Sequence, residues 1–118
     1  MARAGDLEIS IERSAHGSAT VVCVDGDLDM ATAPQLEEAL ERADVSKRIV
    51  IDLSGCTFLD SAAVRALVVT AARRKPAGGK LALVTRDPGI LRVLEIASVD
   101  VLLPVHETIE LASVTPES

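Results

Sequence analysis

The chain is almost without aromatic residues, since it has no Trp and no Tyr, and Phe58 is the single aromatic side chain among 118 residues. Single-stranded nucleic acid would therefore find no stacking platform on its surface. Basic residues are outnumbered as well, with 12 Lys and Arg against 18 Asp and Glu. The resulting formal charge of −6 has the wrong sign for a phosphate backbone. These features together argue against direct binding of nucleic acid.

Cysteine and histidine are scarce, with two residues of each type. Cys23 and Cys56 provide neither a disulfide framework nor a metal-ligand spacing. A zinc site would need both thiols to converge with His16 and His106. We therefore expect two small buried thiols in a reducing compartment, with no metal and no cofactor.

Long apolar runs are missing too, because no run approaches the roughly 20 residues that span a bilayer. The first residues meet charge too soon to resemble a secretory signal. These features predict a cytoplasmic protein with no membrane contact. With no repeat or linker-like tract, we expect a single domain over residues 1–118, with a core of about 7–112 and frayed tails at 1–5 and 113–118.

The apolar pattern predicts alternating strands and helices. Strands are expected over residues 7–12, 19–24, 48–53, 80–85 and 99–103, the first two forming a hairpin through a turn at Gly17. Helices are expected to begin after the N-cap Thr32, at Asp60-Ser61, after the N-cap Asp87, and over residues 107–112. Residues 25–29, 54–59 and 76–79 are predicted connections. The order β-β-α-β-α-β-α-β-α indicates an α/β fold, in which helices cover a mixed, mostly parallel sheet.

Motifs of enzymes are absent from the sequence. It has no phosphate-binding loop, no dinucleotide-binding glycine motif and no nucleophile elbow. Neither His16 nor His106 lies close in sequence to a serine positioned for a triad. We therefore predict a protein that is not an enzyme and has no catalytic residue.

The most strongly patterned polar site is Asp60-Ser61, between a buried strand and a helix. On spacing alone the favoured interpretation is capping, since either side chain can accept bonds from first-turn N–H groups. The same position would also tolerate a phosphate, because those donors and the helix dipole favour an anion.

The helix after Ser61 has an unusual outer face on a helical wheel. One side is predicted to face the sheet and carries Val64, Leu67, Val68 and Ala71. The opposite side carries Ala62, Ala66, Val69 and Arg73. Small residues there would allow a partner to approach closely, although Ala is also simply a good helix former.

Three segments of the chain resemble the STAS domain family, and within it the stand-alone anti-sigma factor antagonists. Residues 24–29, Val-Asp-Gly-Asp-Leu-Asp, resemble the family's Gly-Glu-Leu-Asp turn, with Asp27 in place of Glu. Residues 33–36, Ala-Pro-Gln-Leu, match the start of its first helix. Residues 51–55 and then 58–61 resemble the strand and loop that end in the phosphorylated Asp-Ser-Ser/Thr-Gly motif. The similarity runs from about residue 7 to residue 112.

The resemblance implies a partner-switching function. The unphosphorylated domain would bind an anti-sigma factor that is also a serine kinase, and this kinase would phosphorylate Ser61 and so release the complex. A serine phosphatase would reset the switch. The expected partner contacts are Asp27, Asp29, Asp60, Ala62, Arg65, Ala66 and Val69. As an alternative, Asp27 and Asp29 would be ordinary loop and capping residues.

The motif departs from the family after Ser61, where Ala62 and Ala63 replace Ser/Thr and Gly. The added Cβ at the glycine position could obstruct the backbone of a kinase. Other functions stay open: a STAS adaptor that is not phosphorylated, in a signalling or lipid-transport assembly, or an enzyme with Ser61 as nucleophile. Cys56, at the start of the same loop, is a second candidate for regulation, as an oxidant sensor.

Overall fold

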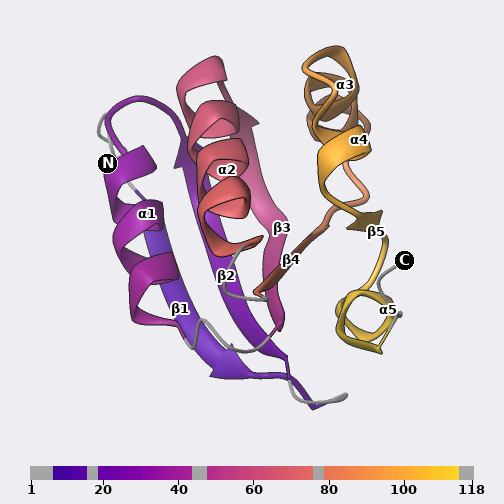
Figure 1. Cartoon of the computed structure of the whole chain (residues 1–118). Coiled ribbons are helices and arrows are strands. Elements are labelled where there is room, and N and C mark those ends of the chain that lie inside the picture. The colour runs from indigo at the N-terminus through magenta and orange to yellow at the C-terminus, as the bar shows by residue number, and fades with distance from the viewer. Residues whose placement is uncertain (1–6, 16–18, 44–47, 76–78, 115–118) are drawn as a thin grey trace.

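The computed structural model of the chain describes residues 7–15, 19–43, 48–75 and 79–114, and a five-stranded sheet forms its centre (Figure 1). The strands are β1 Leu7–Arg13, β2 Thr20–Leu28, β3 Arg48–Leu59, β4 Lys80–Val84 and β5 Val105–His106. The helices are α1 Ala33–Arg42, α2 Ser61–Arg74, α3 Pro88–Ile96, α4 Val99–Leu102 and α5 Ile109–Val114. The sheet order is β1-β2-β3-β4-β5, with β1 antiparallel to β2 and the other pairs parallel. The predicted α/β fold with a mixed, mostly parallel sheet is confirmed.

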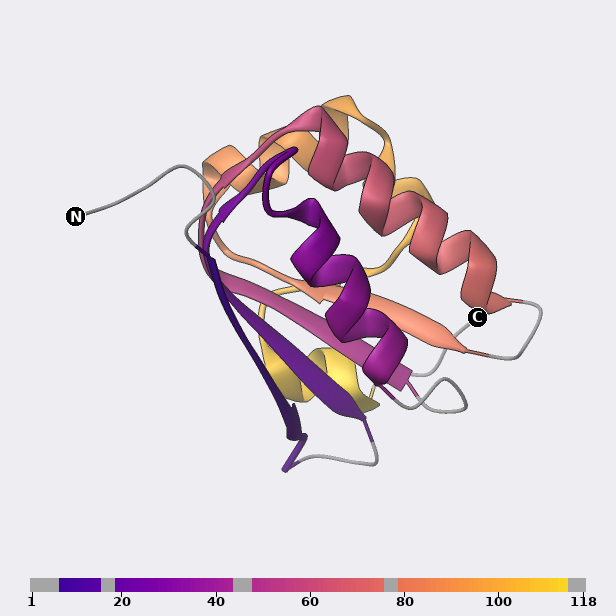
Figure 2. The ribbon, with the colours of Figure 1, turned by 90° about the vertical axis from the view of Figure 1, so that its left-hand side faces the viewer.

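Helices cover the two faces of the sheet unequally (Figure 2). Alternate residues of β2 face opposite sides, so Val22 and Val24 join the larger core beneath α1, α2, α3 and α4. Val21 joins a smaller cluster that α5 closes from the other side. The buried strands therefore read as continuous apolar runs, as expected for parallel strands covered on both faces.

Strands β2 and β3 extend beyond the predicted boundaries, because residues 25–28 and 54–59 pair with each other in parallel. Register shifts between Cys23 and Asp25, and again between Gly26 and Asp27, absorb the irregular polar sequence. Gly26 has a φ of 118°, which a residue with a side chain rarely adopts. The prediction of two loops was wrong, since strand pairing overrides the weak strand propensity of Asp and Gly.

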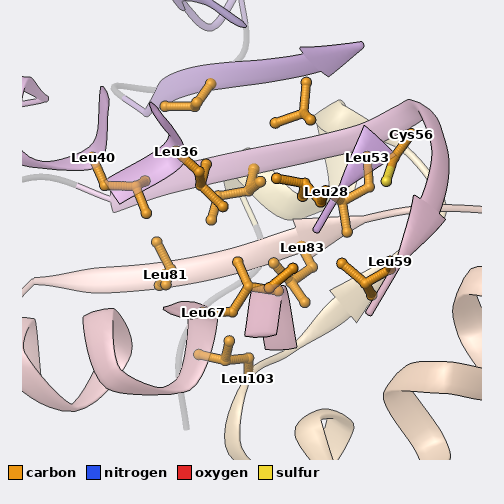
Figure 3. Close-up of a cluster of buried hydrophobic side chains, with 14 of the residues drawn as sticks. Leu28, Leu36, Leu40, Leu53, Cys56, Leu59, Leu67, Leu81, Leu83 and Leu103 are labelled. Carbon is orange, nitrogen blue, oxygen red and sulfur yellow. The ribbon is translucent and has the colours of Figure 1, made fainter. Parts of the chain in front are cut away.

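The ends of β2 and β3 are fixed in the core by Leu28 and Leu59, which are partners in the strand register. Both are almost fully buried, with exposed fractions of 0% and 4%. Figure 3 shows them within the cluster that also contains Leu53, Leu67 and Leu83. The residues that follow each strand therefore start from well-defined positions.

Residues 99–103, predicted as the last strand, instead form α4. Val99 in α4 and Leu103 just after it are buried, and the amide of Leu103 donates to the carbonyl oxygen of Val99 at 2.8 Å. An apolar pair four residues apart fits a helical turn as well as it fits a short strand. The strand comes after Pro104, where β5 pairs with β4.

Ser113 and Val114, predicted to lie in a frayed tail, instead belong to α5, where Ser113 is buried. Its Oγ lies 2.8 Å from Oγ of Ser14, and the two hydroxyls share a hydrogen bond. Arg48 Nη1 donates to the carbonyl oxygen of Ala112 at 2.9 Å. Residues 1–5 and 115–118 of the predicted tails, the turn at Gly17 and the connection at 76–78 lie outside the described residues. Within the described part of the chain, no helix has the length and apolar character needed to cross a membrane.

The larger core predicts a strong stability difference between two leucines. Leu53→Ala empties a fully buried site and should lower the free energy of unfolding by about 2–5 kcal/mol. Leu102→Ala removes the same atoms from a side chain that is 61% exposed and should cost less than about 1 kcal/mol. Urea unfolding followed by far-UV circular dichroism measures both. Equal losses would contradict the assignment of Leu53 to the core.

Candidate functional site

Ser61 is the first residue of α2 and lies exposed where β2 and β3 end together. The N-cap is Asp60, whose carboxylate Oδ1 accepts from the amide of Ala63 at 3.0 Å. Capping, which the sequence could assign to either residue, therefore belongs to Asp60. The hydroxyl of Ser61 stands at the positive end of a 14-residue helix dipole.

The ends of β2 and β3, together with the residues that follow each strand, form one surface, which we call the Ser61 surface and define as residues 27–31 and 57–62. Asp60 joins its two halves, because Oδ2 accepts from the amide of Met30 at 3.2 Å. The amide of Asp60 also donates to the carbonyl oxygen of Leu28 at 3.1 Å. Asp27 Oδ1 accepts from the hydroxyl of Thr57 at 2.7 Å. The structure thus brings Asp27 and Asp60 onto one surface with Ser61.

Asp29 is a turn residue in this surface. Its Oδ1 accepts from the amides of Ala31 and Thr32 at 2.9 and 3.0 Å. The hydroxyl of Thr32 donates to the carbonyl oxygen of Asp27 at 2.7 Å. Thr32 stands at the N-cap position of α1 but makes no side-chain cap bond, so its predicted capping role was wrong. Both side chains instead hold the β2–α1 loop in shape.

The small-residue face of α2 is less open than its helical wheel predicts. Helix α2 contacts α1 on one side and α4 on the other (Figure 1). Ala66 is consequently buried, with 4% of its surface exposed, and Ala62 and Val69 are half-buried. Arg65 is exposed one turn after Ser61. A partner could therefore reach Arg65 directly, whereas the prediction of an exposed Ala66 was wrong.

The position of Ala63 shows whether the side chain at the family's glycine position could obstruct a kinase. Its side chain is fully buried in the larger core. The methyl group at the family's glycine position therefore points into the protein, not toward an approaching backbone. Ala62, the other departure, remains half-buried beside Ser61.

Two residues of the Ser61 surface were missed in the sequence. Met30 and Phe58 are large apolar side chains with exposed fractions of 77% and 51%. The available signal was an isolated apolar residue inside or next to a predicted polar connection, and in Phe58 the chain's single aromatic ring.

Both thiols are poorly ionised. Burial raises the pKa of Cys56, whose Sγ donates to the carbonyl oxygen of Phe58 at 3.1 Å. Burial and the hydrogen bond to Glu12 raise the pKa of Cys23 to about 11. Cys56 is buried as predicted, while Cys23 is half-buried. Because the thiolate is the reactive form, these surroundings disfavour oxidant sensing at Cys56.

A hollow of about 550 Å³ lies apart from the Ser61 surface, at the carboxyl ends of β4 and β5. Its lining residues are Thr85, Arg86, Leu91, Leu94, Glu95, Asp100, Val105, His106 and Glu107. Arg86 and His106 share this lining with the three carboxylates of Glu95, Asp100 and Glu107. In the described residues, no three His, Cys, Asp or Glu side chains are grouped so that they could hold a metal ion.

The strand order and the helices that cover the sheet define a class of small α/β domains. A family model described as "Mlab, STAS domain" matches residues 11–104. Since the match covers most of the chain, the protein belongs to the STAS domain family.

Several relatives are named as antagonists of anti-sigma factors. The anti-sigma-F factor antagonist RsfA of Mycobacterium tuberculosis is 29% identical over 101 residues, which cover 82% of this chain and 79% of RsfA. An anti-sigma factor antagonist from Mycobacterium paratuberculosis has a solved structure with 28% identity and a TM-score of 0.80, covering 95% of both chains. These relatives are binding proteins rather than enzymes, in agreement with the prediction.

The anti-sigma factor antagonist SpoIIAA shares the fold at lower identity. Its unphosphorylated form matches with 20% identity and a TM-score of 0.67, covering 89% of this chain and 92% of SpoIIAA. Its phosphorylated form, described as a Bacillus cell fate determinant, matches with 17% identity and a TM-score of 0.64, covering 89% and 96%.

The cap at α2 predicts a graded response at Asp60. Asp60→Ala removes the acceptor for Ala63 and should lower the free energy of unfolding by about 0.5–2 kcal/mol. Asp60→Asn should lose less than Asp60→Ala, because Asn caps a helix about as well as Asp, although its amide nitrogen cannot accept from Met30 as Oδ2 does. Urea unfolding measures the difference, and amide hydrogen exchange at Ala63 locates it. Wild-type stability in Asp60→Ala would show that this cap contributes nothing.

The raised thiol pKa predicts slow alkylation. In a Cys56→Ser variant at pH 8, iodoacetamide should modify Cys23 about 100-fold more slowly than an unfolded chain, because its pKa lies about two units above the ordinary 9.0. The rate should climb with pH until about pH 11, as the thiolate forms. Mass spectrometry follows the reaction. Equal rates in folded and urea-unfolded protein would refute the raised pKa of the half-buried Cys23 thiol.

Proposed function

We propose that this protein is an anti-sigma factor antagonist whose Ser61 surface binds an anti-sigma factor with serine kinase activity, and that phosphorylation of Ser61 ends the binding. The observation that carries the proposal is the exposed hydroxyl of Ser61 at the first position of α2, with capping left to Asp60. Support also comes from the regulatory names of RsfA and of the Mycobacterium paratuberculosis protein.

Phosphorylation would transfer the terminal phosphoryl group of ATP to Ser61. A bond forms between Oγ and phosphorus, the bond from phosphorus to the bridging oxygen of ADP breaks, and the hydroxyl proton passes to a base on the kinase. A serine phosphatase reverses the modification by hydrolysis. SpoIIAA, whose fold this chain shares, is known in unphosphorylated and phosphorylated forms.

The consequences of the phosphate differ inside and outside the domain. For the domain itself, the phosphate adds about −1.5 to −2 charges at the N-terminus of α2, where the dipole and first-turn amides favour an anion. Outside, a partner shaped for a neutral hydroxyl meets added negative charge beside Asp27 and Asp60. Release therefore needs no change of fold.

The proposal implies a cytoplasmic protein that regulates transcription through its partner. Ala62 favours the alternative, a STAS adaptor that is not phosphorylated, because this residue lacks the hydroxyl that follows the serine in the family motif. Burial of Ala63 removes the steric objection to a kinase at the glycine position.

The direct test is incubation with candidate anti-sigma kinases from the same genome and ATP, followed by intact-mass and peptide mass spectrometry. A single added phosphate that maps to Ser61 and disappears in Ser61→Ala is expected. Ser61→Ala should keep kinase binding, whereas Ser61→Asp should weaken it at least about 10-fold, because a carboxylate mimics part of the phosphate charge.

Two results would count against partner switching. Equal affinity of Ser61→Ala and Ser61→Asp for the kinase would mean that charge at this position does not control binding. A stable complex without any phosphate on Ser61 would favour the adaptor.

A further inference from the structure

We infer that the affinity of the Ser61 surface for the anti-sigma factor comes from two apolar anchors, Met30 and Phe58, and that the aspartates around them select a partner whose docking face is an apolar pocket with a basic rim. This inference rests on the proposed function and assigns the source of its binding energy.

The first step is the exposure of the two side chains. Met30 is 77% exposed and Phe58 is 51% exposed, although both are large and apolar. Scattered exposed apolar residues are ordinary. These two, however, lie close to the Asp60 link: Met30 is in the loop after β2, where its amide donates to Asp60, and Phe58 is two residues before Asp60 near the end of β3. Aromatic side chains and Met are also enriched in the centres of protein interfaces.

The second step is their distance from Ser61. The amide of Met30 lies 3.2 Å from the carboxylate of Asp60, the residue before Ser61. Phe58 precedes Ser61 by three residues, so the two Cα atoms are at most about 11 Å apart. A standard interface covers about 800 Å² of each partner, a patch with a radius of roughly 16 Å. A partner of this size that is centred on Ser61 therefore reaches both anchors.

The third step is preorganisation of the backbone. Asp60 holds the amide of Met30, and Asp29 holds the amides of Ala31 and Thr32. Phe58 is paired with Asp27 in the strand register and is followed by the buried Leu59. Because the backbone positions are already fixed, binding has to order little more than the side chains of Met30 and Phe58.

The fourth step concerns the aspartates. Asp27 accepts from Thr57, Asp29 from its own turn, and Asp60 from Met30 and Ala63. Their carboxylates already accept hydrogen bonds within the domain. They also lie at a solvated surface, where charge pairs add little affinity. They still carry negative charge, which speeds the encounter with a basic partner and excludes acidic ones. Complementarity to this surface therefore requires basic residues around an apolar pocket.

The other expected contacts contribute less area. Ala66 is buried, and Ala62 and Val69 are half-buried between neighbouring helices. Arg65 is exposed, but its positive charge is opposite in sign to the charge of the aspartates. Met30 and Phe58 are thus the side chains of the Ser61 surface with the most apolar area to bury.

The experiment measures binding of an anti-sigma kinase to purified variants by calorimetry. Met30→Ala and Phe58→Ala should each weaken binding about 10-fold or more, while Phe58→Leu should stay within about 3-fold of wild type because the apolar contact remains. Leu111→Ala, on a 49% exposed residue of α5 across the sheet, is the matched control and should bind as wild type. Thermal unfolding by circular dichroism verifies that all variants fold.

A second measurement separates the aspartates from the anchors. Asp27→Asn should lower the association rate and its dependence on salt, with a smaller effect on dissociation. Met30→Ala and Phe58→Ala should instead raise the dissociation rate. Wild-type affinity in both alanine variants would overturn the inference, as would a larger loss of affinity in Asp27→Asn than in either.

Failure of the proposed function has a different signature. If Ser61→Asp binds as tightly as wild type, partner switching fails, and the alanine variants still report whether Met30 and Phe58 anchor the complex. If Ser61→Asp loses binding while Met30→Ala and Phe58→Ala keep it, partner switching stands and the anchor inference fails. If the wild-type protein binds none of the candidate kinases, both fail.

Discussion

The carboxylate of Asp60 is the interaction on which the candidate site depends. One oxygen caps α2 through Ala63, and the other holds the amide of Met30 in the preceding loop. Without this link, the loops after β2 and β3 would be joined mainly by the end of the strand ladder, where Leu28 pairs with Leu59. One side chain therefore both begins the helix that presents Ser61 and aligns the neighbouring loop beside it.

The extended pairing of β2 and β3 supplies the platform for that link. Polar residues usually leave a sheet, but here they stay in the ladder because Leu28 and Leu59 anchor its far end in the core. Gly55 fits closely against the carboxylate of Asp25, where a Cβ would collide. The register shifts, Gly26 and Gly55 thus allow acidic residues at the carboxyl ends of β2 and β3 without loss of the parallel pairing.

The sequence predicted the order of elements well because the periodicity of buried side chains is local. The prediction failed where the secondary structure of a segment depends on the other segments of the chain that it packs against. Residues 25–28 became strand because residues 55–59 of β3 lie beside them, and β1 also pairs with Asp25 and Gly26. Residues 99–102 became helix because Val99 and Leu103 face one core. The site showed the same limit. Asp60 and Ser61 were visible from the motif, whereas the exposure of Met30 and the burial of Ala66 depend on how loops and helices pack.

Because Ala63 is buried, the replacement of the motif's glycine affects the stability of the domain and not the surface that a partner contacts. A glycine in the first turn of a helix costs roughly 0.5–1 kcal/mol relative to alanine, and here the methyl group of Ala63 also fills the larger core. The replacement therefore strengthens the helix start without altering the exposed surface. Only Ala62 changes what a partner meets, by removing one hydroxyl beside Ser61. Within the Asp-Ser-Ser/Thr-Gly motif, the exposed difference between this chain and the family is thus confined to a single lost hydrogen-bonding group.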